Sequence, residues 1–250
     1  MTIKHPTPEL IPLLRTLWKQ AFGDDDRFLD KFFSTAFSPH RCLCIPTEDT
    51  IAAALYWLDC SCRGQKLAYL YAVATEQTHQ GKGLCHALMR KTHELLQAQG
   101  YAGVVLVPGS ESLFRFYEKM GYATFGGMEQ FDACPETPPA ALRQISPEEY
   151  AALRRNYLPE GGVQQEGVTL TFLQTQAGFF AGEDFLFLAA NDGEKLFCPE
   201  FLGNRRVCGS ILSALGKAEG QFRTPGSDKF AMYYPLSSAA PPSYFGLALD

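Results

Sequence analysis

The stretch "THQGKGLCHALMRK", residues 78–91, places Gly81 and Gly83 on either side of Lys82, directly before a pattern of helical spacing. Glycine weakens a helix but accepts backbone angles that other residues avoid. Free amides at a helix N-terminus attract anions, and the helix dipole adds about half a positive charge there. The glycines therefore indicate either a tight strand-to-helix turn or a loop whose bare backbone binds an anion.

Two well-known phosphate-binding loops do not fit this stretch. A GxxxxGK nucleotide-binding loop needs a glycine at position 76 and Ser or Thr at position 83, where the chain has Glu76 and Gly83. A GxGxxG dinucleotide-binding loop needs a third glycine at position 86, which is His86. The pattern that remains is a strand, a short glycine loop and the start of a helix.

A second motif follows the first. The stretch "YAVATEQTHQGKGLCHALM" precedes "LFRFYEKMGY" at residues 113–122, and in this order the two resemble the GNAT superfamily of acetyl-CoA-dependent N-acetyltransferases. The family loop reads Gln/Arg-x-x-Gly-x-Gly/Ala; Gly81 and Gly83 fit it, whereas Thr78 stands in place of the first Gln or Arg. The resemblance extends over residues 1–131, and its departure at Thr78 concerns one side chain rather than the backbone.

The resemblance implies acetyl-CoA as co-substrate. Its pyrophosphate would lie against the amides of residues 80–85, and its pantetheine arm would pair with backbone exposed where residues 67–75 and 102–107 splay apart. The coenzyme-binding residues that follow from this are Val73, Ala74, Thr75, Gln80, Gly81, Lys82, Gly83, Leu84, Cys85 and Ser112.

Tyr117 matches the family tyrosine near the coenzyme sulfur, so the resemblance implies that it protonates the leaving thiolate. A phenol with a pKa of about 10 is able to donate to a thiolate whose conjugate acid has a pKa of about 8.5. The same tyrosine shares a predicted apolar helix face with Leu113, Phe116 and Met120, so a packing role stays open.

The sequence does not identify the base that deprotonates the acceptor. The glutamate that some family members carry on the central strand would fall at Leu67 or Tyr69 here. Glu76, Glu111, Glu129 or a chain of waters stay as alternatives.

The resemblance implies an N-acetyltransferase that acts by direct attack of a primary amine, with a small molecule or a peptide as acceptor. A non-catalytic acyl-CoA-binding or regulatory protein on the same fold is the alternative, and a structural α/β protein is a third interpretation. The oligomeric state stays open, with a homodimer among the options.

Composition narrows the class of protein further. A net charge of −5 disfavours a nucleic-acid partner, because phosphate affinity comes from clustered Lys and Arg. No apolar run approaches the roughly 20 residues that cross a bilayer, and residues 1–12 lack a signal peptide, so we expect a cytoplasmic protein and no membrane partner. The eight cysteines include two CxC pairs rather than the CxxC typical of zinc, so we expect reduced thiols and no metal.

The periodicity predicts a mixed α/β fold whose strands and helices position this loop. Expected helices cover residues 8–22, 24–36, 84–98 and 110–122, and expected strands cover 41–46, 50–60, 66–75, 101–109 and 123–133. Asp24 is the expected cap of the second helix. The expected inner face of the 84–98 helix contains Leu84, Ala87, Leu88, Lys91, Leu95 and Ala98.

Residues 134–147 contain four prolines, and we place a linker over 134–146. Ser146, Pro147 and Glu149 form a capping box that starts a new helix. The second half is expected to repeat the order of the first, with helices at 147–157 and 205–218 and strands at 178–182, 184–191, 194–201, 221–225, 229–236 and 244–250.

This order predicts two GNAT-like domains, 1–133 and 147–250, each with a central mixed sheet flanked by helices. The second half has "PEFLGNRRVCGSIL" at the place of the glycine loop, with Gly203 alone near the turn. We therefore expect the second domain to be degenerate and without a coenzyme site.

Overall fold

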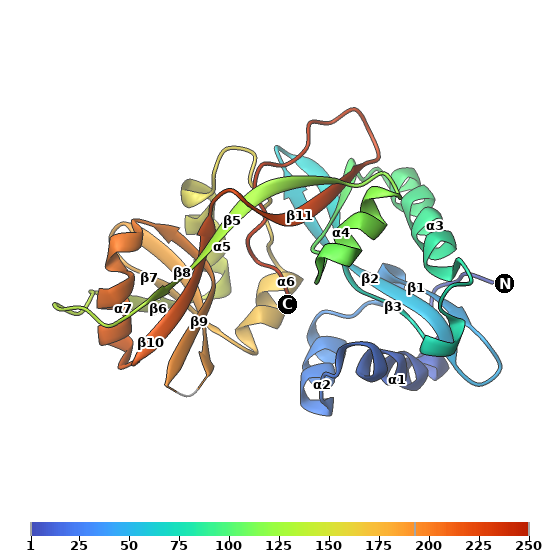
Figure 1. The fold of residues 1–250 in the computed structure, drawn as a ribbon, viewed down its shortest axis with the longest axis horizontal. Helices are drawn as coiled ribbons and strands as arrows, with labels where there is room; N and C mark the ends of the chain where they lie inside the picture. The colour runs from blue at the N-terminus through green and yellow to red at the C-terminus, as the bar shows by residue number, and fades with distance from the viewer. Residues whose placement is uncertain (1, 193, 250) are drawn as a thin grey trace.

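The computed structural model describes residues 2–192 and 194–249 and has the expected mixed α/β fold (Figure 1). The elements of the first half are η1 (Pro8–Leu10), α1 (Ile11–Phe22), α2 (Asp26–Thr35), η2 (Pro39–Arg41), β1 (Cys42–Pro46), β2 (Ile51–Cys62), β3 (Gln65–Thr75), η3 (Gln77–His79), α3 (Leu84–Ala98), β4 (Gly103–Leu106), α4 (Glu111–Glu118) and β5 (Ala123–Ala133). All the helices and strands expected in this half are present.

Up to residue 235 the second half also follows the expected order, with two additions, one short strand and one helix. Its elements are β6 (Arg143–Ile145), α5 (Pro147–Tyr157), α6 (Val168–Gln174), β7 (Gly178–Ala181), β8 (Phe185–Asp192), β9 (Lys195–Gly203), η4 (Arg205–Val207), α7 (Cys208–Leu215), β10 (Glu219–Pro225) and β11 (Asp228–Pro235). Helix α6 was not predicted, because Val168, Thr169 and Thr171 favour strands and its buried residues leave no clear polar face.

The expected strand at 244–250 is wrong for its described part. Residues 244–249 are buried, but their only bridge to another part of the described chain joins Tyr244 to Gly162. This segment therefore packs as an extended tail rather than as a member of the sheet.

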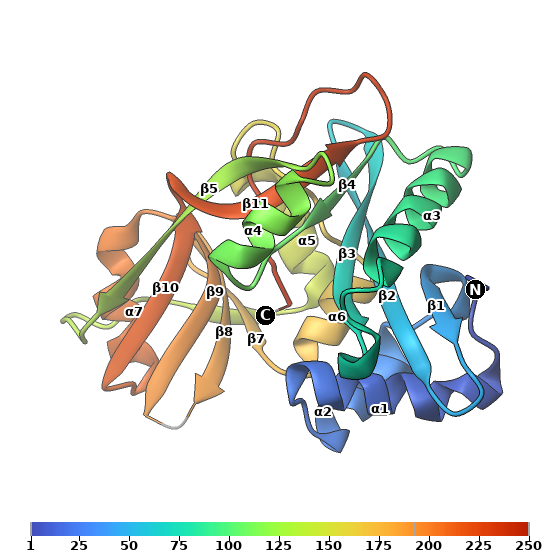
Figure 2. The ribbon, with the colours of Figure 1, turned by 45° about the vertical axis from the view of Figure 1, so that its right-hand side comes forward.

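The eleven strands of the described chain form one sheet in the order β1-β2-β3-β4-β11-β5-β10-β9-β8-β7-β6 (Figure 2). We expected a separate sheet in each half. Instead, β11 of the second half lies between β4 and β5, and β5 in turn lies between β11 and β10. The expected linker also contributes strand β6, which pairs with β7. The division into domains 1–133 and 147–250 is not tested by this arrangement and stays a prediction.

Helices cover both faces of the sheet in the first half (Figure 1). Side chains alternate across β2, so Tyr56 and Leu58 pack with α1 and α2, whereas Leu55 and Trp57 pack with α3 on the opposite face. Two apolar layers therefore hold β2 and β3 as the rigid centre of this half.

Three side chains cap helices at their first turns. Asp25 Oδ1 accepts from the Phe28 amide at 2.8 Å, Ser110 Oγ from Leu113 at 3.4 Å, and Ser146 Oγ from Glu149 at 3.2 Å. The helix start at Ser146 and Pro147 is thus confirmed, but the Glu149 carboxylate binds Arg143 at 2.6 Å, so the contacts show the Ser146 half of the capping box alone. The cap of α2 is Asp25 and not Asp24. Asp24 lies one residue too early, and its Oδ2 instead accepts from Trp18 Nε1 at 2.8 Å.

The buried face of α3 differs from the expected one. Lys91 and Ala98 are exposed, and the buried residues are Leu88, Met89, Thr92, His93 and Leu96. Thr92 and His93 were not expected on this face. Thr92 Oγ1 donates to the Leu88 carbonyl at 2.9 Å, and His93 Nε2 lies 2.7 Å from the Tyr122 hydroxyl. Because both side chains are hydrogen-bonded, burying them leaves no unsatisfied polar group in the core.

A buried ion pair organises the second half. Arg154 on α5 donates to both carboxylate oxygens of Glu200 on β9, at 2.6 and 2.8 Å, and Arg154 is only 2% exposed. Arg154 also donates to the Val163 carbonyl at 2.9 Å. The adjacent Gln165 donates to the Leu247 carbonyl, which ties the tail at 244–249 to the same network.

Candidate functional site

The glycine loop connects η3 to α3 at the end of β3. Gly81 and Gly83 have φ values of +74° and +73°, a region that favours glycine, so the turn alone requires both residues. A Cβ built at either position meets no atom within 4 Å, so the space in front of the loop is open. The turn and the open backbone, the two explanations offered by the sequence, are therefore both present.

The amides of this loop are available to a ligand. Among the described contacts, the amides of Gly81, Lys82 and Gly83 meet no backbone acceptor, and no side chain caps the N-terminus of α3. The first-turn amides, including those of Leu84 and Cys85, lack intrahelical acceptors as at any helix start. Gln80 differs, because its amide donates to the Gln77 carbonyl at 3.3 Å.

A β-bulge bends β3 away from β4. The register between β2 and β3 shifts between Ala54 and Tyr56, and Ala72 opposite this shift has a φ of +48°, which is uncommon for a residue with a Cβ. The parallel pairing of β3 with β4 ends at Tyr69 and Val105. Residues 70–75 therefore continue without β4, as the expected splay requires.

Alternate residues at the end of β3 direct their backbone groups toward β2 and toward the gap that opens between β3 and β4. The Glu76 amide donates to the Ala52 carbonyl at 2.9 Å, and Ala74 pairs with Ala54, so both residues direct their backbone toward β2. Since backbone groups alternate sides along a strand, Val73 and Thr75 direct theirs into the gap. The Thr75 carbonyl accepts from Gln80 Nε2 on that side at 3.3 Å.

Two cavities meet at the splay. The loop cavity has a volume of about 570 Å³ and is lined by Val73, Thr75, His79, Gln80, Gly81, Gly83, Leu84, Cys85, His86, Leu113, Phe116 and Tyr117. The second, which we call the aromatic cleft, has a volume of about 600 Å³. Its aromatic lining residues are Trp18, Phe22, Phe28, Tyr69, Tyr71, Tyr117, Phe172 and Phe197. Val73, Leu113 and Tyr117 line both cavities, so the two spaces share a boundary at the expected acid.

Tyr117 is 7% exposed and packs edge-on against Phe116 and Tyr122. Burial raises the pKa of Tyr117 well above its ordinary value near 10, and the neighbouring Cys85 adds to the rise. Burial also raises the pKa of the Cys85 thiol, to about 11. Both groups are therefore protonated at neutral pH, and Tyr117 is a hydrogen-bond donor between the cavities.

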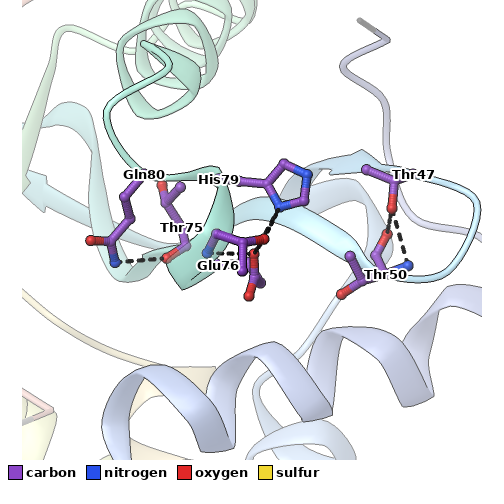
Figure 3. A network of polar contacts seen from close by, with 7 residues as sticks. Thr47, Thr50, Thr75, Glu76, His79 and Gln80 are labelled. Atoms are coloured by element: carbon purple, nitrogen blue, oxygen red, sulfur yellow. Dashed lines mark hydrogen bonds and ion pairs between the residues drawn. The ribbon is translucent and has the colours of Figure 1, made fainter.

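Glu76 is engaged in the turn before the loop (Figure 3). Its Oε2 accepts from the Thr78 amide at 2.9 Å, from the Thr78 hydroxyl and from His79 Nδ1 at 2.8 Å. The Thr78 side chain and His79 hold the pKa of this carboxyl below its ordinary value. Glu76 lines neither cavity, and its observed role is to hold His79 at the wall of the loop cavity.

The remaining residues named from the sequence for the site lie outside the walls of both cavities. Glu111 and Glu129 are paired with Lys229 and Arg205 and line neither cavity. Lys82 is exposed on the loop. Ser112 is exposed too, and its hydroxyl lies 2.9 Å from Ser110 rather than at a cavity wall.

The aromatic cleft was not predicted from the sequence. Its walls come from α1, α2 and the turn between them, β3, β4 and the loop after it, α4, α6, β8, β9 and the tail, so they meet only in the folded chain. Ala248 and Leu249 of the tail line it, and the Leu249 amide donates to the Tyr69 hydroxyl at 3.2 Å. Asp24 is the one charged residue among the described residues of the lining.

Within residues 2–192 and 194–249, no three His, Cys, Asp or Glu side chains gather as a metal ion would require, and the cysteines are all free. No helix in the described chain has the length and apolar character needed to span a bilayer.

Comparison with known proteins agrees with this geometry. Residues 2–125 match the family model of the acetyltransferase (GNAT) domain. No curated protein gives a significant match to the chain.

Solved structures are similar over nearly the whole chain. A GCN5-related N-acetyltransferase from Kribbella flavida is 14% identical with a TM-score of 0.72, over 94% of this chain and 70% of that one. A GCN5-related N-acetyltransferase from Anabaena variabilis is 15% identical with a TM-score of 0.71, over 94% and 72%. A putative acetyltransferase from Pyrococcus horikoshii is 14% identical with a TM-score of 0.69, over 94% and 89%.

At these identities the structural likeness demonstrates a shared fold, whereas the family match identifies the domain that carries the glycine loop, the splay and Tyr117. Through residues 2–125, the chain belongs to the GNAT superfamily.

Proposed function

We propose that the protein is an N-acetyltransferase that transfers the acetyl group of acetyl-CoA to a primary amine by direct attack. The observation that carries this proposal is the position of Tyr117, a buried and protonated phenol on the boundary between a cavity with open amides and a second, aromatic cleft. One cavity suits the coenzyme, the other suits the acceptor, and a proton donor lies where the two would react.

The loop cavity fits the coenzyme. The pyrophosphate would accept hydrogen bonds from amides of residues 81–85, with the exposed Lys82 as a mobile cation beside it. The extended pantetheine arm would pair with the backbone of Val73 and Thr75, which β4 leaves open. We no longer assign Gln80 or Ala74 a backbone contact to the coenzyme, because their own backbone groups face other partners.

The reaction requires no covalent enzyme intermediate. An ammonium loses one proton to water, and the free amine attacks the thioester carbonyl carbon to form a C–N bond. The C–S bond then breaks, the sulfur takes a proton, and the nitrogen gives one up. The products are an N-acetylated amine, the coenzyme thiol and one proton released to solvent.

The chain's own groups would assist two of these steps. A β3 amide in the gap, such as that of Val73, would donate to the oxyanion, and one such donor is worth about 3 kcal/mol. Tyr117 would donate its proton to the departing sulfur and recover one from the nitrogen. The carboxylates of Glu76, Glu111 and Glu129 line neither cavity, so we assign the first deprotonation to water.

Two measurements test the proposal. Calorimetry with acetyl-CoA is expected to give a dissociation constant in the micromolar range, and the absence of binding at millimolar coenzyme would contradict the loop assignment. Release of free thiol with a panel of primary amines is expected to exceed the rate of hydrolysis without amine. Coenzyme binding without amine-dependent release would instead favour a non-catalytic acyl-CoA-binding protein.

A further inference from the structure

We propose that the acceptor is a primary amine with an aromatic or similarly bulky apolar body, bound in the aromatic cleft with its cationic charge attracted by Asp24. This inference rests on the proposed function and names the substrate class of that site.

The first observation concerns exposed apolar side chains. Among the described residues, the exposed large hydrophobic side chains are Phe22, at 46%, and Leu113, at 40%. Both line the aromatic cleft, Phe22 at the end of α1 and Leu113 on α4. Exposed apolar groups that gather at one concave site mark an interaction surface, because water contact there is unfavourable until a ligand covers it.

The second observation is the continuity of the aromatic wall. Trp18 and Phe28 have ring centroids 6.2 Å apart, and Phe28 meets Phe172 of α6 at 5.6 Å and 82°. Phe22 in turn lies edge-on to Trp18, with centroids 5.8 Å apart. The wall thus joins α1, α2 and α6: the buried Trp18 and Phe172 support the more exposed Phe22 and Phe28, which are open to an apolar body.

The third observation is the charge on this wall. Asp24 Oδ2 accepts from Trp18 Nε1 at 2.8 Å, which holds the carboxylate at the cleft. An alkylamine has a pKa near 10.4, so it arrives as an ammonium ion. The carboxylate attracts this cation, and the faces of Trp and Tyr rings add a cation–π contribution.

Phenylethylamine and ethylamine provide a matched test, because they differ by one phenyl ring. Burial of that ring predicts a kcat/KM for thiol release that is roughly 30-fold higher for phenylethylamine. Spermidine serves as the hydrophilic polyamine. Equal or higher kcat/KM for ethylamine or spermidine would overturn the inference while leaving the transferase intact. Release with none of the amines would overturn the proposed function and this inference with it.

Variants of the cleft provide the second arm. Phe22→Ala is expected to lower kcat/KM for phenylethylamine roughly 5-fold and to lower kcat/KM for ethylamine much less, because ethylamine has no ring to contact Phe22. Because Phe22 is 46% exposed, its replacement by alanine should not impair folding. A loss shared equally by both amines would contradict the placement of the ring.

Asp24→Asn is expected to lower kcat/KM for both amines by roughly 10-fold. Asp26→Asn is the matched control, since Asp26 is 67% exposed and bound to Arg15 and Lys19 outside the cleft. Calorimetry of phenylethylamine in the presence of desulfo-CoA gives a readout independent of turnover. Equal effects of the two Asn variants would overturn the role of Asp24.

Discussion

The unit β3–α3–β4 of the first half and the unit β9–α7–β10 of the second have the same topology. Each is a parallel strand pair connected by a helix, and each first strand pairs on its other side with a strand whose register shifts once. The two units differ at the loop before the helix.

The second loop is filled where the first is open. A Cβ at Gly203 would meet the Asp184 carbonyl oxygen at 2.6 Å, whereas a Cβ at Gly81 or Gly83 meets nothing. The Asn204 side chain accepts from the Arg206 amide at 3.1 Å, and Arg205 is bound to Glu129 at 2.8 Å. The same topology therefore carries an open loop, our proposed anion site, in one place and a packed loop in the other.

The two halves also differ in what they bury. The second half buries the Arg154–Glu200 pair, and removing one partner of such a pair leaves a charge without compensation. Arg154→Met is expected to lower the free energy of unfolding by about 3–5 kcal/mol, measured by urea denaturation. The double variant Arg154→Met with Glu200→Leu serves as control and should regain part of this loss. A loss below about 1 kcal/mol would show that the pair is not a main support of the second half.

Matched acidic substitutions in the two loops test whether the first loop alone binds the coenzyme. Gly83→Asp is expected to weaken acetyl-CoA binding at least ~100-fold, because it adds a negative charge and a Cβ at a φ of +73°. Gly83→Ala has the same backbone cost without the charge and should lose less. Asn204→Asp in the second loop should leave the affinity unchanged. Similar losses in both loops, measured by calorimetry, would break the contrast.

The buried faces of α3 and α7 predict different responses to acid. Burial lowers the pKa of His93 on α3 to about 4, whereas the buried residues of α7 are apolar or glycine. Because the folded pKa lies below the unfolded value near 6.5, the unfolded chain binds the proton first as pH falls. Neutral His93 therefore costs the protein no stability above about pH 6.5. As the pH falls from 6.5 toward about 4, the free energy of unfolding decreases, by about 2 kcal/mol at pH 5.

Denaturation of the His93→Gln variant at pH 7 and pH 5 measures this contribution. The variant is expected to lose less stability than the parent over this interval, since glutamine does not titrate. An identical pH dependence in the two proteins would show that other groups cause the acid sensitivity.

The smallest expected effect concerns Tyr117. Tyr117→Phe should lower kcat roughly 10-fold and leave the dissociation constant of acetyl-CoA within about twofold, because a thiolate leaves readily without full protonation. Since burial raises the pKa of Tyr117 above its ordinary value, the parent rate should not fall from tyrosine ionisation up to pH 10. An unchanged kcat in the variant would assign Tyr117 to packing alone.

Local pattern predicted most elements and the glycine loop, because spacing, caps and turn residues act over a few positions. The glycines at 81 and 83, the helix cap at Ser146 and the succession of most strands along the chain are of this kind. The inner face of α3 was missed at Thr92, which donates within the helix to the Leu88 carbonyl, and at His93, whose partner Tyr122 comes close only in the folded chain.

The arrangement across the sheet was beyond local pattern. No residue type marks Ala72 as the site of a bulge with a φ of +48°, yet this bulge lies where β3 leaves β4, at the gap to which we assign the coenzyme. The aromatic cleft combines Trp18, Phe172 and Leu249, which are far apart in sequence. Such contacts depend on the exchange of strands between the halves rather than on any one segment.

The position of β11 has a consequence for biogenesis. On a ribosome, β4 and β5 emerge long before the strand that separates them in the finished sheet. Until nearly the whole chain has been translated, the facing edges of β4 and β5 must stay unpaired or form a transient pairing with another strand. Contacts of such long sequence separation fold slowly, so newly made chains depend on protection of these strand edges during the wait.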